Sequence, residues 1–261
     1  MAPDRIDPEN RHTASRNGSQ ADASVVVSCT GLAKAYGSGE GRVQALDGVD
    51  LEVHAGELVI LRGPSGSGKT TLLNLLGTLD RADAGTVSIG GRDVTAATET
   101  ELVELRRHEL GYIFQSFALL PVLSAAENVD LPMRIVGMPT AEREARVTEL
   151  LAAVGLTGHE NQRPDELSGG QQQRLGIARS LANHPRVLIA DEPTGQLDST
   201  NADAMMSLIA RLVHETGVAA LVTTHDPRMA TYADRILDLR DGRIDAGRPG
   251  RHSTTAAVTP A

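Results

Sequence analysis

The residues best suited to chemistry form one glycine-rich stretch that ends in a lysine and a threonine. The stretch comprises Gly63, Pro64, Ser65, Gly66, Ser67, Gly68, Lys69 and Thr70, with Thr71 next. Glycines permit positive φ and let successive backbone N–H groups turn toward one anion. Lys69 can reach β- and γ-phosphate oxygens, and the Thr70 hydroxyl can ligate a Mg²⁺ shared with them. Every fixed position of the Walker A phosphate-binding pattern is therefore matched.

The segments on either side of this loop supply the context that the pattern requires. The apolar run over residues 58–61 predicts a strand, and residues 71–76 continue a helix that begins near Lys69. The positive end of that helix dipole would point at the same anion. A glycine-rich surface turn would need neither flank, so the sequence favours a phosphate site.

A second candidate for chemistry is the carboxylate pair Asp191 and Glu192, which ends the apolar run over residues 187–190. Such a run predicts a buried parallel strand whose carboxyl end faces a ligand. Asp191 could hold Mg²⁺, and Glu192 could act as general base or orient the attacking water. The alternative is a pair of acids that cap the next helix.

Three further residues have an ambiguous role when each is considered alone. Gln115 ends a predicted strand over residues 110–115, and His225 lies just past another over residues 219–223, at the sheet edge where a ligand is expected. Both could be structural hydrogen-bonding groups. Tyr36 lies in an expected glycine-bounded loop, where its ring could stack on a base or simply cover surface.

The helix expected over residues 175–181 begins with a second potential anion site. Ser168 is a suitable N-cap, and Gly169 and Gly170 expose backbone N–H groups just before Gln171 and two more glutamines. An ordinary capped helix explains the serine but requires neither the glycine pair nor the glutamines. The residues alone leave both interpretations open.

Composition excludes several classes of function. The chain has 261 residues, of which 40% are hydrophobic, which suits a globular protein with a sizeable core. A net charge of -9 and an aromatic content of 2% argue against nucleic acid as a partner. Cys29 is the one cysteine, so neither an intrachain disulfide nor a cysteine zinc cluster is expected. No apolar run is long enough to span a bilayer, and the first residues lack the apolar core of a secretory signal.

The order of segments predicts an α/β fold of the P-loop NTPase type. Residues 1–23 are expected to be a disordered leader, residues 24–246 the folded domain, and residues 247–261 a disordered tail. Alternating strands and helices around the phosphate loop indicate a three-layer core. The strands before the loop are expected to form an N-terminal antiparallel β subdomain. Residues 116–183 are expected to form an inserted α-helical subdomain.

Taken in order, these motifs resemble the nucleotide-binding domain of ABC transporters. The resemblance covers about Val25 to Ala246. The matching motifs are the Walker A loop, Gln115, Leu167-Ser168-Gly169-Gly170-Gln171, residues 187–192, Gly195-Gln196-Leu197-Asp198 and His225. The Leu-Ser-Gly-Gly-Gln signature between the Walker motifs is highly specific to ABC ATPases. One departure is Gln196, where similar proteins usually carry asparagine.

The resemblance implies a homodimer in which two ATP molecules lie between the Walker A loop of one chain and the signature of the other. Ser168 and Gly170 would then contact the γ-phosphate bound by the partner chain, and Asp198 would be the aspartate of the D-loop.

The resemblance also implies roles within one chain. Tyr36 would stack on adenine, and Gln115 would meet Mg²⁺ and the attacking water. His225 would contact the γ-phosphate, and Glu192 would be the catalytic base.

A finer similarity narrows the subfamily. Residues 111–117 (GYIFQSF), 119–121 (LLP) and 190–195 (ADEPTG) are similar to ATPases of lipoprotein-release and macrolide-export systems. This similarity implies a peripheral subunit at the cytoplasmic face of the cell membrane, which drives export or mechanotransmission through a separate permease. The alternatives are the ATPase of an ABC importer and a soluble ABC ATPase without a transport role. A nucleotide-binding scaffold without turnover is disfavoured, because Glu192 and His225 are both intact.

Overall fold

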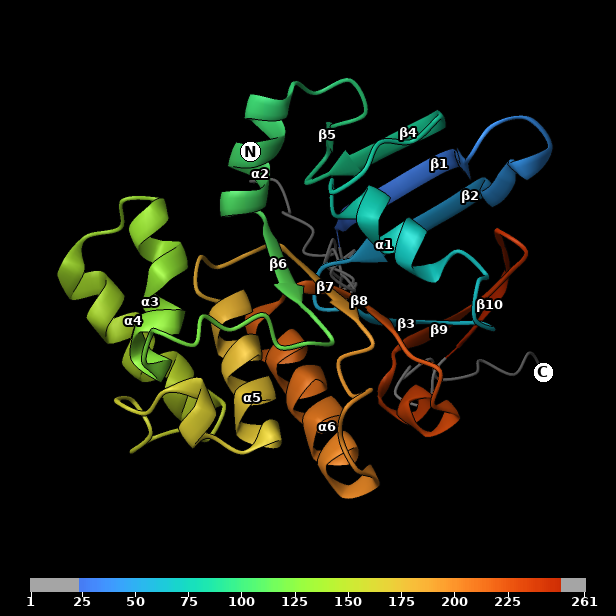
Figure 1. The fold of residues 1–261 in the computed structure, drawn as a ribbon. Coiled ribbons are helices and arrows are strands. Elements are labelled where there is room, and N and C mark those ends of the chain that lie inside the picture. The colour runs from blue at the N-terminus through green and yellow to red at the C-terminus, as the bar shows by residue number, and fades with distance from the viewer. Residues whose placement is uncertain (1–23, 250–261) are drawn as a thin grey trace, which may run out of the picture.

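The structure is a computed structural model that describes residues 24–249 (Figure 1). Its strands are β1 (Val25–Tyr36), β2 (Val43–His54), β3 (Leu58–Arg62), β4 (Ala84–Ile89), β5 (Arg92–Asp93), β6 (Leu110–Ile113), β7 (Val187–Asp191), β8 (Ala219–Thr223), β9 (Arg235–Arg240) and β10 (Arg243–Pro249). Its α-helices are α1 (Lys69–Leu76), α2 (Glu99–His108), α3 (Ala125–Ile135), α4 (Thr140–Ala153), α5 (Gly169–Ser180) and α6 (Ser199–Thr216).

The larger sheet has the order β10-β9-β3-β8-β7-β6, and all its strands except β10 run parallel to their neighbours. Residues Leu58 to Leu61 in β3 are fully buried, as are the four residues that begin β7. Apolar side chains therefore cover both faces of these strands, as expected for a parallel sheet enclosed by other layers. The register sets Asp191 opposite Thr223, so strands β7 and β8 end at the same edge.

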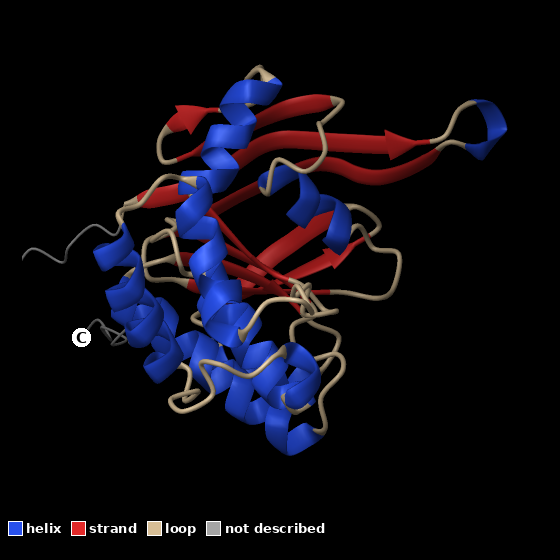
Figure 2. Cartoon of the chain, turned by 60° about the vertical axis from the view of Figure 1, so that its left-hand side comes forward, coloured by secondary structure: helices blue, strands red, loops and turns tan. Residues whose placement is uncertain are grey.

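The smaller sheet is antiparallel, with the order β2-β1-β4-β5, and α1 lies between it and the larger sheet (Figure 1). Leu72, Leu73 and Leu76 of α1 join one core cluster with residues from both sheets. On the other face of the larger sheet, α5 and α6 share a second cluster with α3 and α4. The expected three-layer α/β core and the antiparallel β subdomain are thus confirmed, and Figure 2 shows a group of helices below the strands and another helix between the two sets of strands.

Capping residues in the sequence explain where three helices begin. Thr98 with Glu101, Ser124 with Glu127, and Ser168 with Gln171 form capping boxes at α2, α3 and α5. In each pair the first side chain accepts from the backbone N–H of the second residue, and the second side chain accepts in return. The start of the signature helix is therefore fixed by residues within the signature.

Two local expectations differ from the structure. Tyr36 is the last residue of β1 instead of part of a loop, because its backbone still pairs with Val43 of β2. Strand β10 continues to Pro249, three residues past the expected end of the domain, because residues 248 and 249 pair with β9. The expected hairpin is present, with Asp241 and Gly242 both at positive φ in its turn. The leader over residues 1–23 and the tail from residue 250 lie outside the described residues.

The loop between β6 and α3, which carries Gln115, is held by one fully buried amide. The side chain of Asn128 accepts from Leu120 N at 2.9 Å and donates to the carbonyl oxygens of Leu120, Leu123 and Ser124 at 3.0 to 3.2 Å. No part of Asn128 is exposed. Its amide thus replaces backbone hydrogen bonds that the irregular loop cannot make for itself.

Replacing this amide should destabilise the fold. We expect Asn128→Ala to lower the free energy of unfolding by about 2 to 4 kcal/mol and Tm by about 5 to 10 °C, because buried loop groups lose their partners. Thermal unfolding of the purified chain measures the effect. Asn161→Ala, at an exposed position, is the matched control and should shift Tm by less than about 2 °C. Equal Tm values for the two variants would contradict this role of Asn128.

Candidate nucleotide-binding site

The loop between β3 and α1 is shaped by glycines that no larger residue could replace. Gly68, the N-cap of α1, has a φ of 104°, and a Cβ atom there would lie 2.3 Å from the Ala45 carbonyl oxygen. A Cβ atom at Gly63 would lie 2.1 Å from the Leu239 carbonyl oxygen. Strands β2 and β9 thus press against the loop from both sides. This contact fixes where its backbone N–H groups point.

Lys69 folds back over the loop that precedes it. Its Nζ atom donates to the carbonyl oxygens of Gly63 at 2.9 Å and Pro64 at 3.0 Å, and the residue is buried. Among the side chains that the structure describes, this ammonium group contacts carbonyl oxygens and takes part in no ion pair. The ammonium group can therefore exchange its hydrogen bonds to these two carbonyl oxygens for bonds to an incoming phosphate, whose negative charge it would balance.

Thr70 and Asp191 meet at the carboxyl edge of the larger sheet. The Thr70 hydroxyl donates to Asp191 Oδ2 at 3.0 Å, and Asp191 Oδ1 accepts from the Thr223 hydroxyl at 2.6 Å. Hard oxygen donors of this kind suit Mg²⁺, which binds through one or two protein groups and substrate phosphates. Among the described residues, no three His, Cys, Asp or Glu side chains are grouped so that they could hold a metal ion by themselves. The Thr70 hydroxyl and the Asp191 carboxylate are oxygen donors that fit a Mg²⁺ held jointly with nucleotide phosphates.

Glu192 and His225 form a pair at the same edge. Glu192 Oε2 lies 3.0 Å from His225 Nδ1, and the Glu192 backbone is left-handed, with a φ of 46°. A Cβ atom at Gly195 would lie 3.0 Å from Gln115 Nε2 and 3.5 Å from Glu192 Oε2. The amide of Gln115 and the carboxylate of Glu192 therefore converge above Gly195.

These groups border a cavity of about 430 Å³. Its lining consists of Tyr36, Val43, Ala45, Ser65, Gly66, Gly68, Lys69, Thr70, Thr71, Glu192 and His225. The cavity joins the end of β1 to the phosphate loop and to the carboxyl ends of β7 and β8. The structure thus brings together most of the residues that the sequence places within one chain's nucleotide site.

Tyr36 is anchored at the rim of this cavity. Its hydroxyl donates to Asp80 Oδ2 at 2.8 Å, while Lys34 donates to Asp80 Oδ1 at 2.9 Å and stands 5.2 Å from the ring centroid. Burial and the bond to Asp80 raise the pKa of Tyr36. Burial opposes ionisation of Asp80, but hydrogen bonds from Lys34 and Tyr36 outweigh it and lower the pKa of that carboxyl. One edge of the ring is therefore held while 43% of the residue is exposed.

The residues of the signature lie apart from the cavity. Ser168, Gly169, Gly170 and Gln171 begin α5, and Asp198 caps α6 by accepting from Asn201 N at 3.0 Å. Ser168 and Gly169 are exposed, and a Cβ atom at Gly169 would meet nothing within 4 Å. In one chain Ser168 with Gln171 caps α5 and Asp198 caps α6, and the exposed residues Ser168 and Gly169 can contact another molecule.

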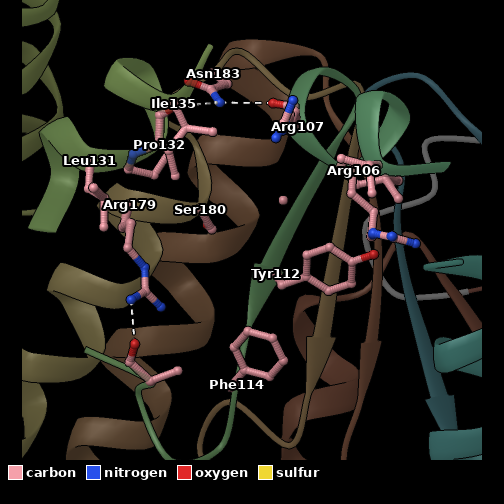
Figure 3. Close-up of a pocket in the computed structure, with 14 residues that line it drawn as sticks. Arg106, Arg107, Tyr112, Phe114, Leu131, Pro132, Ile135, Arg179, Ser180 and Asn183 are labelled. Atoms are coloured by element: carbon pink, nitrogen blue, oxygen red, sulfur yellow. Dashed lines mark hydrogen bonds between the residues drawn. The ribbon is translucent and has the colours of Figure 1, made fainter. Parts of the chain in front are cut away.

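A separate groove of about 470 Å³ lies between α2, β6, α3 and the end of α5 (Figure 3). The rings of Tyr112 and Phe114 stack in it with their centroids 5.8 Å apart, and Leu131 and Ile135 border it from α3. Arg179 enters from α5 and donates to the carbonyl oxygens of Ala118 at 2.5 Å and Phe117 at 3.1 Å. Phe117 and Ala118 both have positive φ, so this arginine holds the strained turn that follows Gln115.

Residues 46–195 match the family described as ABC transporter, which is more than half of the chain. The chain belongs to the ABC transporter family. It is 48% identical over 219 residues to the lipoprotein-releasing system ATP-binding protein LolD of Ruegeria sp. (strain TM1040), covering 84% of this chain and 96% of that protein. It is 44% identical to the macrolide export ATP-binding/permease protein MacB of Burkholderia lata, covering 86% of this chain and 33% of that protein.

Solved structures agree with this assignment. The chain superposes with a TM-score of 0.78 on a dimeric post-hydrolysis state of the ATP-binding cassette MJ0796 bound to ADP and Pi, at 40% identity, covering 86% of this chain and 99% of that one. The first curated export ATP-binding/permease relatives are longer, and the chain spans about a third of their length. ATP binding and hydrolysis are thus the activities of the family to which this cassette belongs.

Three groups that support the predicted residues have little or no signal in the sequence. Thr223 ends an apolar run, where a hydroxyl was a weak signal. Asp80 and Arg179 gave none, since their partners Tyr36 and Ala118 are 44 and 61 residues away. Each acts through contacts that only the folded chain defines.

The close approach at Gly68 gives a test of the cavity. We expect Gly68→Ala to weaken ATP binding by about tenfold or more, because its Cβ collides with Ala45 and displaces the phosphate loop. Isothermal titration with ATP measures this affinity. Gly137→Ala is the matched control, since Gly137 has a φ of 76° but no atom within 4 Å of its Cβ position. ATP binding by Gly68→Ala at the affinity of the unmodified chain would contradict the placement of the nucleotide.

Proposed function

We propose that this cassette hydrolyses ATP as a homodimer and drives a separate membrane permease from the cytoplasmic face of the membrane, in export or mechanotransmission. The observation that carries this proposal is the cavity in which Lys69, Thr70, Glu192 and His225 converge, while the residues of the signature do not line it. One chain would thus supply half of a composite ATP site, and the signature of a second copy would supply the other half.

In the proposed reaction, the backbone N–H groups of the phosphate loop and Lys69 bind the β- and γ-phosphates. Thr70 and Asp191, with Gln115 nearby, would hold Mg²⁺, which supplies charge neutralisation at the phosphate oxygens. Glu192 accepts the proton of the attacking water, and His225 holds the carboxylate through the 3.0 Å contact. Tyr36 offers its exposed ring to adenine.

The second copy would contribute its signature. Ser168, Gly169, Gly170 and Gln171 are positioned at the N-terminal end of α5, where backbone N–H groups and the helix dipole favour a phosphate. Asp198 lies at the start of α6, and Asn201 of this helix lies near Gly170. The dimeric cassette with ADP and Pi supports this pairing.

The groove beside β6 is the proposed docking place of the permease. Its apolar floor of Tyr112, Phe114, Leu131 and Ile135 suits one face of a short amphipathic segment, and Arg106, Arg107 and Arg179 suit acidic groups or a helix C-terminus on that segment. Phe114 directly precedes Gln115, so a partner seated there adjoins the nucleotide site. Among residues 24–249, no helix is long and apolar enough to cross a bilayer.

Two relatives support a permease partner in different ways. The name of the MacB relative joins an ATP-binding part and a permease in one protein. The LolD relative is an ATP-binding protein of nearly the length of the matched region. The second pattern supports the proposal of a permease that is separate from this chain.

One experiment tests the function as a whole. A tagged Glu192→Gln chain is expressed in its own cell, membranes are solubilised in mild detergent with ATP and Mg²⁺, and the proteins that co-purify are identified. We expect a membrane protein with four membrane helices and a large extracytoplasmic domain. A partner of importer type would overturn the export assignment. Recovery from the soluble fraction without any membrane protein would favour a non-transport ABC ATPase.

The catalytic role of Glu192 gives a kinetic prediction. We expect Glu192→Gln to bind ATP with unchanged affinity. Its rate of ATP hydrolysis should fall by at least about 100-fold, because an amide cannot accept the proton of water. The variant should also elute as a dimer in ATP during size-exclusion chromatography. Glu215→Gln, on the exposed side of α6, is the control and should keep the original rate. Hydrolysis by Glu192→Gln at that rate would show that another group is the base.

Docking in the groove gives a second prediction. We expect Ile135→Glu to reduce co-purification of the membrane partner by about tenfold, because a carboxylate would be buried in an apolar contact. ATP binding should be unchanged, since Ile135 does not line the nucleotide cavity. Val25→Glu, at another exposed apolar position, is the control. Undiminished recovery of the partner with Ile135→Glu would place the docking surface elsewhere.

A further inference from the structure

The hydroxyl of Thr223 occupies the one polar position in an otherwise apolar strand. The four residues before it in β8, Ala219 to Val222, are buried, and Thr223 itself has an exposed fraction of 0%. A buried hydroxyl needs partners on both its proton and its oxygen. Both partners of Thr223 belong to the two adjacent acidic residues at the end of β7.

The Thr223 hydroxyl donates a hydrogen bond to the carboxylate of Asp191. Thr223 Oγ1 donates to Asp191 Oδ1 at 2.6 Å, a distance typical of a hydrogen bond to a carboxylate. This bond leaves Asp191 Oδ2 for Thr70, whose hydroxyl lies 3.0 Å away. The carboxylate of Asp191 is thereby held with one oxygen on the sheet and the other toward the phosphate loop.

The oxygen of the same hydroxyl accepts a hydrogen bond from the backbone of Glu192. The backbone N–H of Glu192 donates to Thr223 Oγ1 at 3.0 Å. Glu192 is a residue other than glycine at a φ of 46°, a backbone state that persists only where its surroundings hold it. In this state its carboxylate reaches His225 Nδ1. The hydrogen bond that Glu192 N–H donates to Thr223 thus fixes Glu192 where the chain leaves β7.

We propose that Thr223 is a positioning residue for ATP hydrolysis, which sets the Asp191 carboxylate and the Glu192 backbone through one hydroxyl. The proposal rests on the proposed function, because it takes Glu192 as the base. Thr223 is fully buried and does not line the nucleotide cavity. Its contribution is to hold both acids in the geometry that the reaction needs, and a valine of the same shape would fill the space without making either bond.

The test compares three variants of the full chain. Thr223→Val removes the hydroxyl at nearly constant volume, Thr223→Ala removes it without risk of overpacking, and Thr223→Ser keeps it. Thr216→Val is the matched control, since that hydroxyl donates to Leu212 in α6, away from the site. Steady-state hydrolysis is measured against ATP and against Mg²⁺, and ATP affinity is measured separately without Mg²⁺.

We expect Thr223→Val and Thr223→Ala to lower kcat by about tenfold to hundredfold, as small misplacements of catalytic groups do. Their ATP affinity without Mg²⁺ should stay within about twofold of the original, because the phosphate loop is untouched, and half-saturation should need more Mg²⁺. Thr223→Ser should restore most of kcat. A purely structural role would not produce this separation of kcat from ATP affinity, nor rescue by serine.

Three outcomes would overturn the proposal. These are an unchanged kcat in Thr223→Val, a kcat in Thr223→Ser as low as in Thr223→Ala, and equal losses in Thr216→Val. If Thr223→Val and Thr223→Ala do not fold, a kcat of Thr223→Ser more than tenfold below the original would still refute the role of the hydroxyl, and retention of kcat would support it. An unmodified chain without ATP hydrolysis would instead refute the proposed function.

Discussion

The structure depends on the parallel pairing of β3, β8 and β7 between two apolar layers. Buried strands have to satisfy their backbone groups within the sheet, and parallel pairing sends all their carboxyl ends to one edge. That edge is where the polar residues begin: the phosphate loop after β3, Asp191 and Glu192 at β7, and His225 after β8. The apolar runs therefore create the site indirectly, because they fix the register in which its polar residues meet.

Much of this arrangement could be predicted from sequence because it is local. The loop from Gly63 to Thr70 follows its strand and opens its helix within a few residues, and Ser168 with Gln171 caps α5 through a contact three residues apart. The buried strand that ends at Asp191 was equally evident from its uninterrupted apolar run. Such features depend on neighbouring residues, so the sequence alone contains the information they need.

The remainder depends on contacts between residues far apart in the sequence. Tyr36 was expected in a loop, yet it ends β1 because β2 pairs with it and Asp80 binds its hydroxyl. The domain was expected to end at residue 246, yet β9 holds β10 to Pro249. Arg179 supports the turn after Gln115 across 61 residues. None of these pairs has a periodic or motif signal, because each is selected by where distant strands and helices come together.

In the proposed complex, few residues would separate the docked membrane partner from the nucleotide site. Phe114 borders the groove and Gln115, the next residue, reaches the space above Gly195 where Glu192 points. The turn that follows is strained at Phe117 and Ala118, and it is held to α5 by Arg179. Helix α5 in turn begins with the signature. A shift at the groove would therefore act on both halves of the proposed composite site, one through Gln115 and the other through α5, and this would give the proposed docking a physical route to the site of hydrolysis.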